Sequence, residues 1–179
     1  MNATRDKNLN AVASAGLVLG AVFGMAGTFL AQPAPRNLCW EIDSAGLVMA
    51  ASLLALKFFR RGNDWVAAGF LVFAIGEAAM LSGQGAGLRE SIPAFAAGTV
   101  LWATALLLIS VPKEFAFWVR LAGVVAAILF AITATSTFAG HPLSPLSTPL
   151  PFFGYPFLVL AFIGWIWTLL RENRAAKPA

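Results

Sequence analysis

The stretch that decides the fold is LNAVASAGLVLGAVFGMAGTFLA, residues 9–31, which contains no charged residue. A helix needs about 20 mostly apolar residues to cross the hydrocarbon core of a bilayer. The stretch follows Arg5 and Lys7, as the apolar core of a signal peptide follows basic residues, but such a core has only about 7 to 15 residues. We therefore expect a retained first transmembrane helix.

The whole chain has a similar composition. Of its 179 residues, 59% are apolar and 11% are charged, and the mean hydropathy is +0.79, whereas soluble domains contain roughly a quarter charged residues. This length accommodates about five to seven spans and leaves no room for a separate soluble domain. The sequence therefore predicts an all-α, polytopic membrane protein in which residues 1–179 form one transmembrane domain.

Charge and capping residues divide the chain into six predicted spans. The second span is the weakest, because only residues 44–56 are free of charge. It becomes long enough if Lys57 extends its ammonium group to the membrane surface and if Asp43 or Ser44 caps its start. Pro93 suits the first turn of the fourth span. The predicted spans are residues 9–31, 43–59, 65–84, 91–111, 115–139 and 152–170.

Basic residues are distributed unevenly between the two sides that these spans define. With the N-terminus inside, the outer side holds only Arg36 and Arg89. Because cytoplasmic loops are enriched in Lys and Arg, the sequence predicts six transmembrane helices with both termini inside (N-in/C-in), in a bacterial cytoplasmic (inner) membrane. The basic residues on the inner side are Arg5, Lys7, Lys57, Arg60, Arg61, Lys113, Arg120, Arg171, Arg174 and Lys177.

Small residues recur at helical spacing on the first and third predicted spans. Helices in lipid associate through close packing and polar contacts, so such faces are typical contact surfaces. They could pack within a compact six-helix bundle, or the first-span face could form a homo-oligomer or join a larger membrane complex. A glycine face does not identify its partner, so both hypotheses stay open. The residues are Gly16, Gly20 and Gly24, and Gly69, Gly76 and Gly83.

Glu77 is the acidic residue that the predicted spans place within the hydrocarbon. Such a group costs about 2.5 to 3.5 kcal/mol on insertion scales and marks a candidate site. Gln84 shares its helical face. Hydroxyl groups of the fifth span are expected at similar depth, where they could bond to Glu77, line a polar site, or bond to their own helix. Glu77 is therefore either a structural clamp or a ligand, ion or proton site. The hydroxyl residues are Thr133, Thr135, Ser136 and Thr137.

His141, the single histidine, follows this hydroxyl segment in an outer loop. It could relay protons to Glu77, although an exposed loop position is the simpler interpretation. One histidine and the lone Cys39 do not make a metal motif or an internal disulfide. The loop around residues 140–157 is apolar and proline-rich, so we expect it to cap the bundle, lie in the membrane interface, or act as a lid or partner-binding segment.

Recognisable catalytic machinery is missing from the sequence, which shows no serine elbow, no paired aspartates and no basic active-site cluster. The scattered basic residues do not suggest nucleic-acid binding, and no cofactor is expected. The sequence favours a non-enzymatic component in contact with membrane lipid, either an accessory subunit or a bundle that binds a small ligand or lipid. The alternative is a small transporter or channel with a proton or ion site at Glu77. A membrane enzyme would need a cofactor or a site that the sequence does not reveal.

Overall fold

The computed structural model describes residues 3–175, which form six α-helices joined by turns and one longer loop. Each helix is long and apolar enough to cross a membrane, so the prediction of an all-α chain with six candidate spans is confirmed. Lys177, one of the basic residues assigned to the inner side, lies outside the described residues. The helices are α1 (Ala3–Phe29), α2 (Pro33–Arg60), α3 (Asp64–Gln84), α4 (Ile92–Ser110), α5 (Phe117–Phe138) and α6 (Gly154–Ala175).

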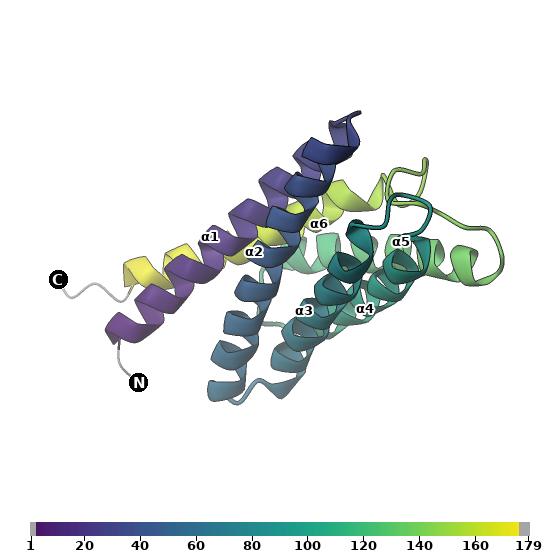
Figure 1. Cartoon of the computed structure of the whole chain (residues 1–179). Coiled ribbons are helices and arrows are strands. Elements are labelled where there is room, and N and C mark those ends of the chain that lie inside the picture. Colours follow the sequence, from purple (N-terminus) through teal and green to yellow (C-terminus); the bar gives the residue numbers. More distant parts are fainter. Residues whose placement is uncertain (1–2, 176–179) are drawn as a thin grey trace.

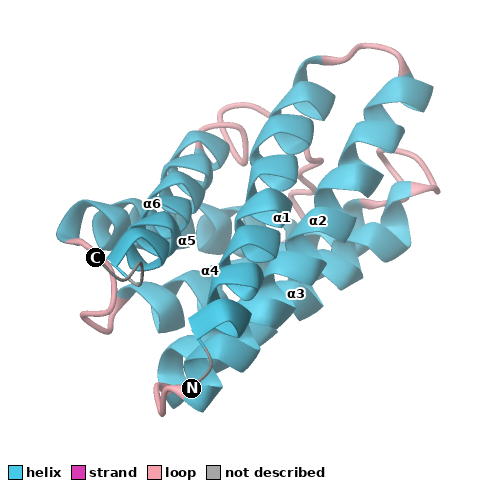
Figure 2. Cartoon of the chain, turned by 90° about the vertical axis from the view of Figure 1, so that its left-hand side faces the viewer, coloured by secondary structure: helices cyan, strands magenta, loops and turns pink. Residues whose placement is uncertain are grey.

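The helices form a closed ring. Each one packs against its neighbour in the sequence, and α6 returns to pack against α1 (Figures 1 and 2). The start of α1 and the end of α6 therefore lie at the same end of the bundle, together with the α2–α3 and α4–α5 turns (Figure 1). We call this end the base, and we call the opposite end, with the three other connections, the rim.

The outer surface of the ring is apolar. Large hydrophobic side chains are exposed along the middle of each helix, where a soluble bundle would present charged ones. An apolar surface of this extent needs a cover of lipid or protein, and it agrees with six membrane-spanning helices. Examples are Val18, Val22, Leu71, Ile75, Leu121, Ile128, Leu160 and Ile163.

Helix α2 begins at Pro33, well before the predicted start at residue 43. Pro33 and Pro35 stand in the first turn, where the missing backbone N–H costs no helical hydrogen bond. The sequence analysis had placed the charged residues between Pro35 and residue 43 outside the helix. In the structure the helix accommodates Arg36, which is buried with its guanidinium 5.6 Å from the centre of the Trp40 ring. Asp43 therefore lies inside α2 instead of capping it.

Lys57, which was expected to extend its ammonium group to the membrane surface, places that group in an ion pair and a hydrogen bond at the base of the bundle. Its side chain is only 4% exposed, and Nζ lies 2.7 Å from Glu172 Oε2 and 2.7 Å from Asn10 Oδ1. Arg61 donates to both oxygens of the same carboxylate, at 2.9 and 2.8 Å, and this contact holds the pKa of its guanidinium above the ordinary value. These bonds tie α1, α2 and α6 together at the base.

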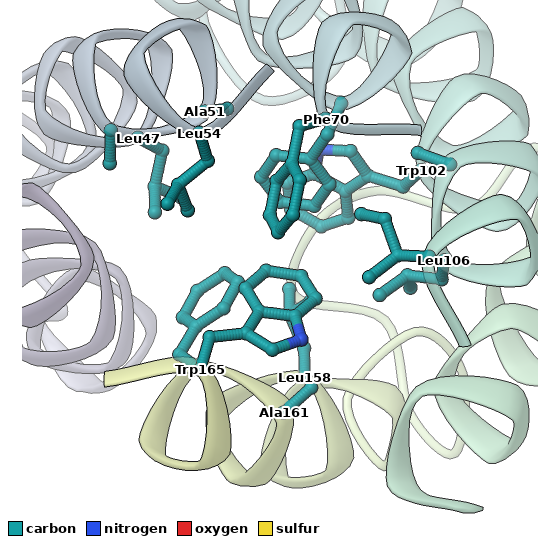
Figure 3. Packing of buried hydrophobic residues seen from close by; sticks show 14 of the residues in the cluster. Leu47, Ala51, Leu54, Phe70, Trp102, Leu106, Leu158, Ala161 and Trp165 are labelled. Atoms are coloured by element: carbon teal, nitrogen blue, oxygen red, sulfur yellow. The ribbon is translucent and has the colours of Figure 1, made fainter. Parts of the chain in front are cut away.

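Aromatic side chains fill the centre of the ring above this network (Figure 3). The rings of Phe70 and Trp165 meet edge to face with their centres 4.9 Å apart. Phe73 and Trp102 stack at 5.7 Å, and such pairs add about 0.5 to 1.5 kcal/mol beyond the burial of their area. Glu77 follows Phe73 by one helical turn, so the aromatic cluster separates Glu77 from the base.

The glycine faces pack against helices of the same chain. A Cβ on Gly16 would lie 2.5 Å from the carbonyl oxygen of Gly46, and one on Gly76 would lie 3.1 Å from Leu101 Cβ. Only a residue without a side chain permits these approaches. The glycine face of α1 is therefore covered by α2. Gly16, Gly20 and Gly24 lie against α2, and Gly69, Gly76 and Gly83 lie against α4.

Candidate functional site

A cavity occupies the rim half of the ring, bordered by α1, α2, α3, α4 and α6. About 80 Å³ of it admits the centres of water-sized molecules, and its unfilled space reaches about 810 Å³ when open water at its mouth is included. A single water needs only about 10 to 15 Å³ on the first measure. The cavity therefore has room for several waters or for a small organic molecule.

Most of the cavity wall is apolar, but several polar side chains interrupt it, and four of their atoms lack a hydrogen-bond partner among the described residues. Asp43 Oδ1, Glu77 Oε1, Gln84 Oε1 and Trp102 Nε1 are buried and have no hydrogen-bond partner among residues 3–175. An unpartnered buried polar group costs about 1 to 3 kcal/mol. Within that part of the chain, only two other buried side-chain atoms lack a partner. The unsatisfied groups are thus concentrated at this cavity.

Glu77 is the most deeply buried of the four side chains, with an exposed fraction of 1%. Ser44 of α2 and Trp102 of α4 lie beside its carboxyl group. Asp43 reaches the same cavity from α2, and its carboxylate rests against α1 at Gly24, where a Cβ would come within 2.8 Å of Oδ2. The glycine of α1 therefore creates the space in which the second carboxyl group lies.

Gln84 is held at the cavity by the NH2 end of its side-chain amide. Its Nε2 donates to Ser44 Oγ at 3.0 Å, which leaves Oε1 without a partner among the described residues. Tyr155 completes the wall, because its hydroxyl donates to the carbonyl of Pro145 at 2.9 Å and holds the proline-rich loop against the bundle.

The predicted site residues of α5 lie apart from this cavity. Thr133 Oγ1 donates to a carbonyl of its own helix at 2.9 Å, and Thr137 Oγ1 donates to the Thr133 carbonyl at 3.1 Å. Ser136 Oγ donates to the carbonyl of His141 at 3.4 Å, and the histidine is exposed. None of these four residues is part of the cavity wall. The structure thus brings Glu77 and Gln84 together but not the α5 hydroxyls or the histidine.

Asp43 is the site residue that the sequence analysis missed. It was interpreted as the cap of a short second span, because charged residues precede it and interrupt the hydropathy. A signal was present: Trp40, Ser44, Leu47 and Ala51 recur with the spacing of one helical face and continue it through residue 43. Periodicity, unlike mean hydropathy, tolerates a charged residue inside a helix.

Metal ligands are sparse at the site. Among residues 3–175, no three His, Cys, Asp or Glu side chains lie close enough together to hold a metal ion. The fold is thus a bundle of six candidate membrane-spanning helices. Near its rim lies a mostly apolar cavity whose wall includes two carboxyl groups. The chain matches no protein-family model, no curated protein and no solved structure.

Proposed function

We propose that this chain is a multi-pass protein of a bacterial cytoplasmic membrane that binds a small ligand in the rim cavity and catalyses no reaction. The observation that carries the proposal is the concentration of unpartnered buried polar atoms around one apolar space. Ligand sites combine an apolar wall with a few convergent polar groups in this way. A bound molecule that supplied the missing partners would repay the cost of burying them.

The charge distribution supports an orientation for this protein. Lys57, Arg61, Lys113 and Arg171 lie at the base, whereas Arg36 and Arg89 belong to the rim half. Because basic residues near the ends of spans favour the cytoplasmic side, we propose that the base faces the cytoplasm, with both termini inside. The cavity would then be approached from the outer side of the membrane.

Filling the cavity tests the binding proposal. Ala21 lines the cavity from α1, whereas its neighbour Val22 is 56% exposed on the outside of the same helix. We expect Ala21→Phe to weaken the binding of a small aromatic probe by about tenfold or more, because the new ring occupies the space. The matched substitution Val22→Phe should leave binding unchanged.

The probes are benzylammonium, benzyl alcohol and benzoate, which share a ring and differ in charge. Their binding is measured by calorimetry on the protein in lipid nanodiscs, with the heat of empty nanodiscs subtracted. Binding of at least one probe that Ala21→Phe removes and Val22→Phe retains supports the proposal. If no probe binds, or if all bind equally well to both variants, the cavity is not a ligand site.

A small transporter is the second candidate, because two carboxyl groups facing one cavity could carry a proton or another cation. Phe70 and Trp165 precede and follow the cavity residues Glu77 and Phe162 on α3 and α6, so the aromatic cluster lies between this cavity and the base, and transport would require a rearrangement of the bundle. Proton and benzylammonium flux in liposomes, compared between the natural chain and Glu77→Gln, distinguishes the two candidates. Flux that depends on Glu77 would favour transport over binding alone.

A further inference from the structure

The unpartnered atoms at the cavity define the chemistry of a suitable ligand. Resting on the ligand-binding function proposed above, we infer that the cavity recognises a protonated primary amine on a small apolar body. When the two carboxyl groups are ionised, Asp43 Oδ1, Glu77 Oε1 and Gln84 Oε1 are acceptors, whereas Trp102 Nε1 is the single unpartnered donor that the described residues place there. A primary ammonium group has three N–H donors and no acceptor. Its donors are thus equal in number to the three oxygen atoms.

The charge of the cavity also favours a cation. Asp43 and Glu77 line it, and the described part of its wall contains no Lys, Arg or His. The guanidinium of Arg36 is the basic group nearest along α2, but it lies over the Trp40 ring, and the ion pairs of residues 3–175 are all at the base. Burial and mutual repulsion oppose the ionisation of two carboxyl groups in a space shielded from water, and a bound cation compensates both effects.

An organic cation fits the cavity better than a metal ion. Ca²⁺ takes about six to eight oxygen ligands and Mg²⁺ keeps near-ideal octahedral coordination, but the unpartnered oxygen atoms that the described residues place at the cavity come from two carboxyl groups and one amide. The remaining wall is formed by apolar and aromatic side chains such as Trp40, Phe95 and Phe162. Aromatic faces attract ammonium groups, and the apolar surface suits a hydrocarbon body.

The test compares the three benzyl probes at neutral pH, where benzylamine is protonated. We expect benzylammonium to bind about tenfold or more tightly than benzyl alcohol, and benzoate to bind weakest, because a charge-assisted hydrogen bond contributes about 1.5 to 3 kcal/mol. Asp43→Asn and Glu77→Gln should each weaken benzylammonium binding by about tenfold to a hundredfold. Neither substitution should change the affinity for benzyl alcohol.

Glu41→Gln is the matched control, because Glu41 is an exposed carboxylate on the same helix as Asp43. It should leave the affinity for all three probes unchanged. Retained binding of benzyl alcohol shows that the site variants fold. If Glu77→Gln does not fold, Asp43→Asn provides the test, since Asp43 is less buried than Glu77.

The possible results distinguish failure of the amine inference from failure of the proposed ligand-binding function. If benzyl alcohol or benzoate binds as tightly as benzylammonium, or if both site variants bind benzylammonium normally, the amine inference is overturned. The cavity would remain a ligand site provided that Ala21→Phe still removed binding. If no probe binds at all, the proposed function fails together with the inference.

The ammonium group could belong to a soluble amine or to the headgroup of an aminophospholipid. Nanodiscs of phosphatidylcholine alone, compared with nanodiscs that also contain phosphatidylethanolamine, distinguish these sources. Competition by phosphatidylethanolamine that disappears in Asp43→Asn identifies a lipid amine. Unchanged benzylammonium binding in the mixed nanodiscs identifies a soluble amine. Either result supports recognition of an ammonium group.

Discussion

Lys57 and Glu77 are both ionisable residues buried within the ring of helices, but their surroundings differ. Lys57 has a carboxylate and an amide oxygen within 2.7 Å, whereas Glu77 Oε1 has no partner among residues 3–175. A buried charge is tolerated when a partner of opposite charge and additional hydrogen bonds compensate it. The base network therefore has a structural role, whereas the rim carboxyl groups are the ones to which we assign ligand binding.

Removing the carboxylate from the base network should destabilise the bundle. In Glu172→Gln, the ammonium of Lys57 stays buried but loses its counter-charge. We expect the free energy of unfolding to fall by about 2 kcal/mol, less than for a fully buried pair because Glu172 is 30% exposed. Denaturant titration in detergent micelles measures the loss.

A double substitution separates charge from packing in this network. Lys57→Met with Glu172→Gln removes the buried ammonium as well, so we expect the pair to cost less than the sum of the two single changes. Additive losses would mean that the ion pair does not stabilise the base. Glu41→Gln, which removes an exposed carboxylate from α2, should have little effect on unfolding.

At the scale of the helices, α2 shows what could and could not be predicted from the sequence. Long uncharged stretches such as residues 9–31 predicted the spans well, because hydropathy alone determines them. The start of α2 was missed because charged side chains inside the ring have local compensation that a single sequence does not display. The neighbours of Glu77 were missed for a related reason. Helical periodicity gives the face of a helix but not the helix opposite, and the Glu77 carboxyl group lies beside α2 and α4, not α5.

The close approach of α1 to α2 depends on glycine and can be tested at Gly16. A Cβ there would lie 2.5 Å from the Gly46 carbonyl oxygen, a backbone atom that cannot move without the helix. We expect Gly16→Val to lower the unfolding free energy of the single chain by about 1 to 3 kcal/mol, as overpacking does. Thermal melting in detergent, with the oligomeric state followed by size-exclusion chromatography, measures both effects.

Ala15 provides the control for this substitution, since it is exposed on the neighbouring position of α1. Ala15→Val should leave the melting temperature nearly unchanged. Normal stability of Gly16→Val, combined with loss of an oligomer, would contradict the packing of this face against α2. It would instead favour the homo-oligomer hypothesis for the first-helix glycines.

At the scale of the whole molecule, the proposed orientation decides which compartment supplies the ligand. With Cys39→Ala as background, Gly85→Cys places a thiol in the rim turn, where a Cβ meets no atom within 4 Å, and Asp64→Cys places one at the exposed base turn. A membrane-impermeant maleimide added to intact spheroplasts should label Gly85→Cys alone, and both variants once the membrane is permeabilised. The basic residues of the base cause this asymmetry, because they favour the cytoplasmic side. Labelling of Asp64→Cys alone in intact cells would reverse the orientation, and the cavity would then take its ligand from the cytoplasm.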